Sequence, residues 1–238
     1  MDDATYQRLL AKAERTRNLN TVDQFLHYWA REAPDRVAFD GDDLTVTFAG
    51  LEEDSARIAS ALLALGLAKG DRIAWLGKNA ATYFVLLLGA ARAGIVMTPI
   101  GWRLAEPEVA YILDDAEARV LFLGDGFEAA AATLGKRPGL IACFCADDAR
   151  KLLREAPRGT FAPSGPDEAV LQAYTSGTTG KPKGVVLSNR NFIGLRQTGL
   201  ARFHPYALND DDEAYLIAMP CAHVAGTAPG FMSLVQGM

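Results

Sequence analysis

The eleven residues Tyr174 to Gly184 read Y-T-S-G-T-T-G-K-P-K-G and combine three glycines, one serine, three threonines and two lysines. Glycines let the backbone approach a ligand closely and adopt positive φ, so that successive N–H groups form an anion-binding nest. Hydroxyls add hydrogen-bond donors or ligands for a phosphate-bound magnesium ion, and lysines add positive charge. This stretch therefore predicts a loop that binds nucleotide phosphates.

Two better-known phosphate loops do not fit this stretch. A Walker A motif needs G-x-x-x-x-G-K-[ST], whereas the order here is Gly177-Thr178-Thr179-Gly180-Lys181-Pro182, with proline where the magnesium-binding hydroxyl belongs. The G-x-G-x-x-G pattern of dinucleotide-binding folds is also absent from it. A purely structural turn between two strands rarely carries so many hydroxyls and two lysines, so we favour phosphate binding.

Other candidate residues carry weaker signals. His223 follows an expected strand, where a lone histidine is more commonly structural than catalytic. The acidic run Asp210 to Glu213 matches no calcium-loop spacing and is typical of a solvated loop. We interpret three aromatic residues as packing residues rather than stacking platforms: Trp75, Trp102 and Tyr83.

The surrounding chain alternates between strand and helix signals. Helices are expected at 4–17, 21–32, 48–65, 79–93, 106–114, 127–134 and 189–202. Strands are expected at 37–39, 44–47, 72–76, 95–99, 119–123, 140–145, 169–173, 184–187 and 213–219. Repeated strand–helix–strand units predict the α/β class, with mostly parallel sheets flanked by helices.

Proline and glycine mark the clearest linker, at residues 157–167. We therefore divide the chain into an N-terminal extension (1–20), a first α/β subdomain region (21–165) and the start of a second α/β subdomain carrying the phosphate loop (166–238). The expected strands at 169–173 and 184–187 lie directly before and after that loop.

Composition narrows the classes of function. The chain has 238 residues, is half hydrophobic and carries a formal charge of −5, which argues against nucleic-acid binding through a broad basic face. Its three cysteines, Cys143, Cys145 and Cys221, fit neither a disulfide framework nor a paired zinc motif. No secretory signal is visible, and Ala80 to Ile100 is interrupted by Arg92, glycines and Pro99. We expect a cytoplasmic protein without a transmembrane segment.

The run Tyr174 to Gly184 closely resembles the phosphate-binding signature of the adenylate-forming superfamily, which contains acyl-CoA synthetases, peptide-synthetase adenylation domains and luciferase-like enzymes. The resemblance extends from about residue 20 onward through Thr47-Phe48, Gly70 to Ala74, Asn79, Pro99-Ile100 and Met219-Pro220 with His223. It implies two packed α/β subdomains. It also implies that a carboxylate attacks ATP to give an acyl-adenylate and pyrophosphate, after which the thiol of coenzyme A displaces AMP.

The resemblance also implies roles for individual residues. The loop would hold the β- and γ-phosphates of ATP with Mg²⁺, through Thr175, Ser176, Gly177, Thr178, Thr179, Gly180, Lys181 and Lys183, with Thr178 as the metal ligand. His223 would lie near the bound carboxylate as the catalytic candidate, although Ala222 replaces the aromatic residue common in relatives. Residues 219–230 contain no acid to pair with an amino-acid ammonium, which favours a fatty or aryl acid.

Segments that complete the site in such enzymes have no counterpart here: Y-G-x-T-E, T-G-D, the hinge and the small C-terminal domain. We therefore expect the N-terminal portion of an acid:CoA ligase, closest to the fatty-acid or aryl-acid type and inactive by itself, with a homodimer allowed. The alternative is a complete module that binds a nucleotide or pyrophosphate without turnover. A third option is a structural partner for another subunit.

Overall fold

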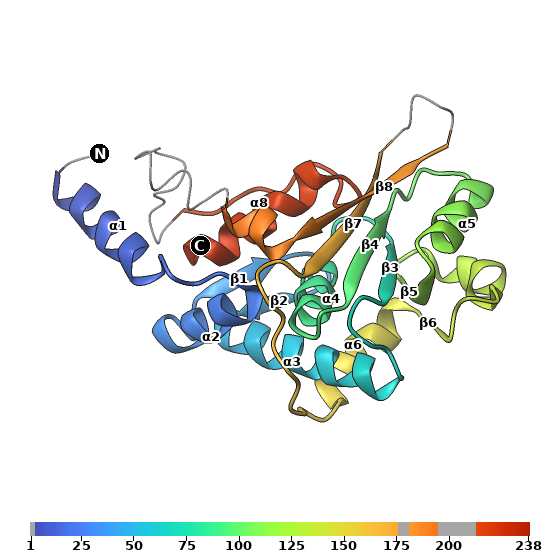
Figure 1. The fold of residues 1–238 in the computed structure, drawn as a ribbon, viewed down its shortest axis with the longest axis horizontal. Helices are drawn as coiled ribbons and strands as arrows, with labels where there is room; N and C mark the ends of the chain where they lie inside the picture. The colour runs from blue at the N-terminus through green and yellow to red at the C-terminus, as the bar shows by residue number, and fades with distance from the viewer. Residues whose placement is uncertain (1–2, 176–180, 195–212) are drawn as a thin grey trace.

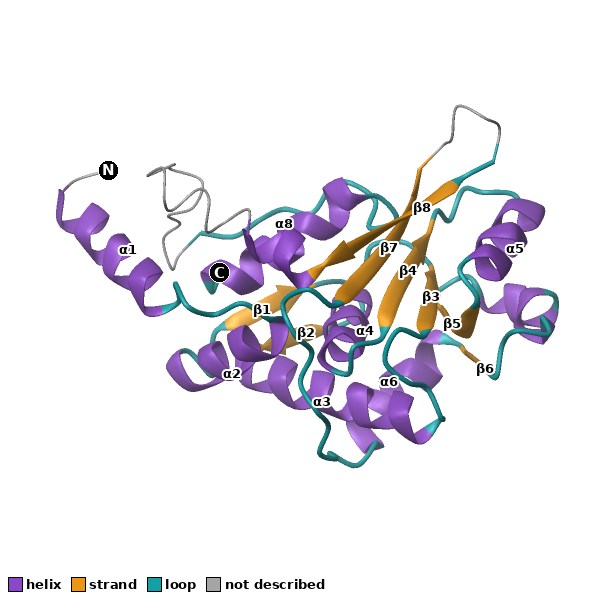
Figure 2. Cartoon of the chain, in the orientation of Figure 1, coloured by secondary structure: helices purple, strands orange, loops and turns teal. Residues whose placement is uncertain are grey.

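The computed structural model describes residues 3–175, 181–194 and 213–238. A six-stranded sheet forms the centre of the molecule and has helices on both faces (Figures 1 and 2). The strand order is β6-β5-β3-β4-β7-β8, and every adjacent pair is parallel except β7 and β8. The strands are β3 (Arg72–Leu76), β4 (Val96–Ile100), β5 (Ala118–Leu123), β6 (Ala142–Phe144), β7 (Ala169–Thr175) and β8 (Lys183–Ser188). The predicted α/β class is confirmed.

Two hydrophobic clusters cover the two faces of this sheet. The larger cluster joins one face to residues of α2 (Val22–Glu32), α3 (Phe48–Ala64), α4 (Ala81–Arg92), α6 (Ala146–Glu155) and α8 (Val224–Gln236). The smaller cluster packs the opposite face against α5 (Glu106–Asp115). All five residues of β4 are buried, as expected for a central parallel strand covered on both sides.

The N-terminal part of the chain lies at one end of the molecule. The helix α1 (Asp3–Arg15) projects away from the sheet at this end, and a small antiparallel pair forms from β1 (Val37–Asp40) and β2 (Thr45–Thr47) (Figure 1). Among the described residues, no helix is long and apolar enough to cross a membrane.

Local chemistry explains where several helices begin and end. The Thr21 side chain accepts a hydrogen bond from the backbone N–H of Gln24 at the start of α2, and Thr47 does the same for Gly50 at the start of α3. The end of α3 is followed by Gly66 in the left-handed region with φ of 84°. These capping residues agree with the predicted helix boundaries.

Arg92 explains how a charged residue fits within an apolar stretch. The side chain is buried at the end of α4, and its guanidinium donates to Asp23 Oδ1 at 2.8 Å and to Glu52 Oε1 at 3.1 Å. Because the guanidinium is paired and hydrogen-bonded with both carboxylates, Arg92 joins α2, α3 and α4 instead of disrupting the core. The stretch Ala80 to Ile100 is thus a buried helix followed by a strand, as predicted.

Two expectations about local structure were wrong, and one helix was missed. In place of the helix expected at 127–134, the chain forms two short 3₁₀ helices, Glu128–Ala132 and Leu134–Lys136. No residue of the first one is buried, and a short helix without buried contacts is only marginally stable. The helix α6 was not predicted. The segment 213–219 has no regular secondary structure and forms no ladder with any described strand, and two of its carbonyls accept hydrogen bonds from the Asn79 side chain.

Residues on both sides of the 157–167 linker contribute to one sheet, since β4 pairs with β7. The linker itself has no regular secondary structure in the described chain. The division at residue 165 stays a prediction, because β7 joins the sheet of the preceding strands by pairing with β4, and β8 pairs with β7.

Candidate functional site

A cavity of about 500 Å³ lies at the carboxyl end of β4 and β7. In open α/β sheets, ligands bind in the crevice outside the carboxyl ends of the strands. The residues that line it come from four segments of the chain: Pro99, Gly101, Trp102, Arg103, Leu104, Glu108, Ile112, Tyr174, Thr175, Pro182, Pro220, Ala222 and His223. The cavity therefore brings together the ends of the predicted phosphate loop and the predicted histidine.

The predicted phosphate loop follows β7 and precedes β8 in sequence, and these two strands form an antiparallel hairpin (Figure 1). Thr175 pairs with Lys183 across this hairpin, and the side chains of Thr175, Lys181 and Lys183 are exposed. Five predicted site residues lie outside the described residues: Ser176, Gly177, Thr178, Thr179 and Gly180. The predicted magnesium ligand, Thr178, is one of them.

His223 occupies the position immediately before α8 and is exposed to the cavity. Within the described chain its imidazole has no hydrogen-bond partner, whereas its backbone N–H donates to the carbonyl of Pro220 at 3.0 Å. The positive end of the α8 dipole lies at this position and favours an anion nearby. The structure thus places His223 and Thr175 on one cavity, although their residue types predict no contact.

Polar contacts, exposed at Asn79 and buried at Thr227, hold the turn that carries His223. Asn79 Oδ1 accepts a hydrogen bond from the backbone N–H of Cys221 at 2.9 Å, and Asn79 Nδ2 donates to the carbonyl of Met219 at 2.9 Å. Thr227 Oγ1 donates to the carbonyl of Cys221 at 2.8 Å and lies 2.8 Å from the hydroxyl of Tyr83. The turn is therefore fixed from α4 and from α8.

Close packing of α8 against this turn requires a glycine. A Cβ on Gly226 would lie 2.2 Å from the carbonyl oxygen of Pro220 and 2.4 Å from that of Met219. Distances this short are forbidden by sterics, so only glycine lets the first turn of α8 approach residues 219 and 220.

An aromatic wall borders the cavity at the end of β4. The half-buried Trp102 ring lies under the guanidinium of Arg103, with 4.1 Å between Arg103 Cζ and the ring centroid, and Lys78 Nζ lies 5.6 Å from the same centroid. Trp75 and Tyr83 are buried packing residues, as predicted. Trp102 also packs at the sheet end, but it lines the cavity as well.

The charges around the cavity suit an anion. Glu108 is the one acidic residue among the lining side chains that the structure describes, and its Oε2 accepts the backbone N–H of Ala105 at 2.8 Å at the start of α5. Lys181 and Lys183 have no ion pair with any described acid. A phosphate group at the loop ends would therefore meet two lysine charges that no described carboxylate neutralises.

Sequence reasoning missed a cluster of polar side chains beneath the loop. Asp115 of α5 accepts a hydrogen bond from the hydroxyl of Tyr174, with 2.6 Å between Asp115 Oδ2 and Tyr174 Oη. Burial and the nearby carboxylate raise the pKa of Tyr174 well above its ordinary value, so the phenol remains a donor. The spacing of Tyr111 and Asp115 places both on one face of α5, but this pattern alone predicts no contact with β7.

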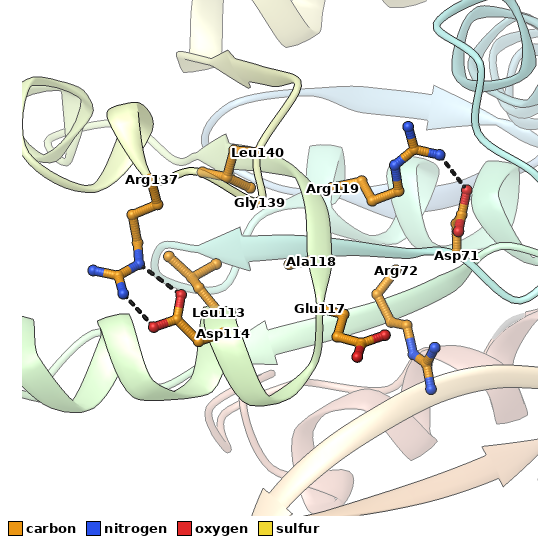
Figure 3. Close-up of a pocket in the computed structure, with 10 residues that line it drawn as sticks. All are labelled: Asp71, Arg72, Leu113, Asp114, Glu117, Ala118, Arg119, Arg137, Gly139 and Leu140. Carbon is orange, nitrogen blue, oxygen red and sulfur yellow. Dashed lines mark hydrogen bonds and ion pairs between the residues drawn. The ribbon is translucent and has the colours of Figure 1, made fainter.

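A second cavity, of about 390 Å³, lies at the opposite edge of the sheet, where β3 and β5 begin (Figure 3). Its charged groups are largely paired with one another: Arg119 Nη1 donates to Asp71 Oδ2 at 2.9 Å, and Arg137 Nε donates to Asp114 Oδ1 at 2.9 Å. This pairing leaves less charge for a ligand than the loop ends offer, so we place the candidate site at the first cavity.

Two further observations concern the cysteines and possible metal ligands. The three cysteines are free thiols in the structure. Across residues 3–175, 181–194 and 213–238, no cluster of histidine, cysteine, aspartate and glutamate could hold a metal ion. Most of the acidic run 210–213 lies outside these ranges.

Comparison with known proteins identifies related chains. Residues 26–238 match the model of the family described as AMP-binding enzyme. The fatty acid–acyl-carrier-protein ligase ScoC of Streptomyces coeruleorubidus is 37% identical over 213 residues, covering 87% of this chain and 40% of that protein. The long-chain-fatty-acid–CoA ligase FadD13 of Mycobacterium tuberculosis is 32% identical over 209 residues, covering 82% of this chain and 39% of that protein.

A solved structure shows the same fold. The inhibitor-bound N-terminal domain of FACL13 from Mycobacterium tuberculosis superposes with a TM-score of 0.76 at 30% identity, covering 92% of this chain and 56% of that one. The present chain spans about 40% of the length of the two curated relatives described above.

Proposed function

Because this chain belongs to the family of AMP-binding enzymes, we propose that it carries the pyrophosphate-binding part of the active site of an ATP-dependent acid–thiol ligase. The observation that carries the proposal is the shared cavity of Thr175, Pro182 and His223 at the carboxyl ends of β4 and β7. The relatives named as ligases support the reaction class.

The proposed reaction has two steps. The carboxylate of the acid attacks the α-phosphorus of ATP, the bond to the β-phosphate oxygen breaks, and an acyl-adenylate and pyrophosphate form. A thiol then attacks the acyl carbon and AMP leaves, giving a thioester. In the first step negative charge builds on the departing pyrophosphate, so fixed donors and lysine charge lower the barrier by stabilising that charge.

We assign the residues as follows. Thr175, Lys181 and Lys183 flank the loop and contact the β- and γ-phosphates, together with residues 176–180. The hydroxyl of Thr178, which lies outside the described residues, would bind Mg²⁺, and the ion would neutralise negative charge on the phosphates. His223 orients the carboxylate, since its imidazole is exposed to the cavity and has no partner in the described chain.

The proposed acid is a fatty acid. Residues 219–230 contain no acidic side chain, and Glu108 is occupied in capping α5, so no carboxylate in the described lining is free to pair with a substrate ammonium. The two curated relatives described above are named as fatty-acid ligases. Coenzyme A is the proposed acceptor thiol, and an acyl carrier protein is the competing acceptor because ScoC is named for it.

Pyrophosphate release tests the proposal. With ATP, Mg²⁺ and a panel of fatty, aryl and amino acids, the longest natural polypeptide containing these residues should release pyrophosphate with fatty acids. The 238-residue chain alone should release none above background, because it covers only part of the length of its relatives. Absence of acid-dependent release from the longer polypeptide would refute the ligase. Tight, saturable binding of ATP or pyrophosphate by the 238-residue chain in calorimetry would instead favour a binding module.

A further inference from the structure

The outgoing end of the phosphate loop is held by α5. The Tyr174 side chain is 9% exposed, and its hydroxyl donates to Asp115 Oδ2 at 2.6 Å. Tyr174 directly precedes Thr175, the last residue of β7. A hydrogen bond to an ionised acceptor is about twice as strong as one between neutral groups. Asp115 therefore fixes the backbone at the position where the chain leaves the sheet.

The returning end of the loop is held by the same helix. Tyr111 lies one turn before Asp115, and its hydroxyl is 3.3 Å from Asp115 Oδ1 and 3.4 Å from the carbonyl oxygen of Pro182. Its single proton is thus shared between the two acceptors. Lys181 Nζ lies 5.4 Å from the centroid of the same ring, within the range of a cation–π contact.

The cluster is braced from the sheet. Gln172 Nε2 donates to the Tyr174 hydroxyl at 3.1 Å, and Arg72 Nε donates to Gln172 Oε1 at 3.2 Å. A Cβ on Gly184 would lie 2.6 Å from Gln172 Nε2 and 3.1 Å from Tyr174 Cζ. The glycine at 184 therefore serves side-chain packing beneath the loop.

From these contacts we propose that Asp115 is a positioning residue that holds both ends of the phosphate loop, through Tyr174 on one side and Tyr111 with Pro182 on the other. This inference rests on the proposed function of the loop. Holding the loop before the phosphates bind reduces the ordering cost of binding and keeps Lys181 aimed at the leaving group.

The neighbouring residue supplies a matched control. Asp114 is also an exposed carboxylate at the end of α5, but it pairs with Arg137 beside the other cavity (Figure 3). Asp115→Ala and Asp114→Ala therefore remove the same group from adjacent positions of one helix. Asp115→Asn keeps an oxygen that can accept the Tyr174 proton and tests rescue. Tyr111→Phe removes the link to Pro182 and leaves Asp115 in place.

The first measurement, hydrogen exchange, does not require enzymatic activity. In the 238-residue chain, hydrogen exchange is measured for peptides covering 172–175 and 183–186. Asp115→Ala should speed exchange there about tenfold relative to Asp114→Ala, and Asp115→Asn should restore most of the protection. Equal exchange in the two alanine variants would overturn the proposal. If Asp115→Ala does not fold, Tyr111→Phe takes its place in the comparison.

The second readout is kinetic, in the longest natural polypeptide. Asp115→Ala should raise the KM for ATP about tenfold, the lower end of the effect of losing an outer-shell contact, while thioester formation from supplied acyl-adenylate stays unchanged. Equal loss in both half-reactions would show a merely structural role and overturn the proposal. If the wild type shows no acid-dependent turnover while the exchange difference persists, the proposed function fails and the anchoring by Asp115 stands.

Discussion

Asn79 and Cys221 are 142 residues apart in sequence, yet Asn79 Oδ1 accepts the backbone N–H of Cys221 at 2.9 Å. Through this contact and two bonds from Nδ2 to the carbonyls of Ile217 and Met219, one side chain before α4 fixes the segment that leads to His223. The position of the candidate catalytic histidine therefore depends on a residue outside the cavity.

Replacing Asn79 by alanine should loosen this segment. We expect a loss of about 1 to 2 kcal/mol of unfolding free energy, because three hydrogen bonds at an exposed site are lost and water replaces part of them. Thermal unfolding measures the effect, with Asn18→Ala as the surface control. A destabilisation no larger than that of the control would show that the three bonds contribute nothing.

Replacing Gly226 by alanine should be more costly. The new methyl group would overlap the carbonyl oxygens of Pro220 and Met219, so α8 must move away from the turn. Overpacking of this kind costs about 1 to 3 kcal/mol. Gly139→Ala is the control, because its Cβ would lie 3.7 Å from the nearest atom, Ala118 O. Equal unfolding midpoints for the two variants would contradict the close approach.

Asp54 of α3 provides a prediction with a pH dependence. Burial raises the pKa of its carboxyl from 3.8 to about 6, and Arg57 opposes the shift. Since the folded pKa lies above the unfolded one, the stabilisation from protonation is complete below pH 3.8 and is lost as the pH rises through about 6. Asp54→Asn should therefore stabilise the chain at pH 7 by about 1 kcal/mol, after allowance for solvent screening, and give little gain at pH 4.

Melting curves of Asp54→Asn and Glu53→Gln at pH 4 and pH 7 test whether the substitution at Asp54 stabilises the chain. Glu53 is exposed and pairs with Arg57 at 2.5 Å, so its substitution should give no gain at pH 7. A lower melting temperature of Asp54→Asn at pH 7 would mean that the pairing of Asp54 with Arg57 outweighs the desolvation of the carboxylate.

The thiols should react slowly. Burial raises the pKa of Cys221 to about 12 and that of Cys143 to about 11. At pH 8 only roughly one Cys221 in 10,000 is then a thiolate, the form that reacts with alkylating agents. Timed alkylation followed by mass spectrometry should find Cys221 the slower of the two, with the difference removed in guanidinium. Rapid labelling of Cys221 in the folded chain would contradict its burial.

Particular residues show which structural features can be predicted from the sequence alone. The caps Thr21 and Thr47 and the strands beside the phosphate loop were predictable, because each depends on residues within a few positions. The contact of Asp115 with Tyr174 spans 59 residues, and the contact of Asn79 with Cys221 spans more. Neither pair has a local signal, since the partners meet only after the helices pack on the sheet.

The cavity shared by Thr175 and His223 was predictable only in part. The loop and His223 were each found from their residue types and from the family resemblance, but it is the folded chain that brings Thr175 and His223 to the lining of one cavity. The two 3₁₀ turns at 128–136 and the segment 213–219, which joins no described strand ladder, show the reverse, because there the sequence pattern predicted a helix and a strand that the structure does not form.

Lys183→Ala tests the central claim most directly, in the longest natural polypeptide that contains this chain. The rates of adenylation and of thioester formation from supplied acyl-adenylate are measured separately, with the exposed Lys136→Ala as control. If the loop between β7 and β8 holds the leaving pyrophosphate, Lys183→Ala should slow adenylation about 10- to 100-fold and leave the second step nearly unchanged. Equal losses in both steps, or no loss in adenylation, would contradict the account.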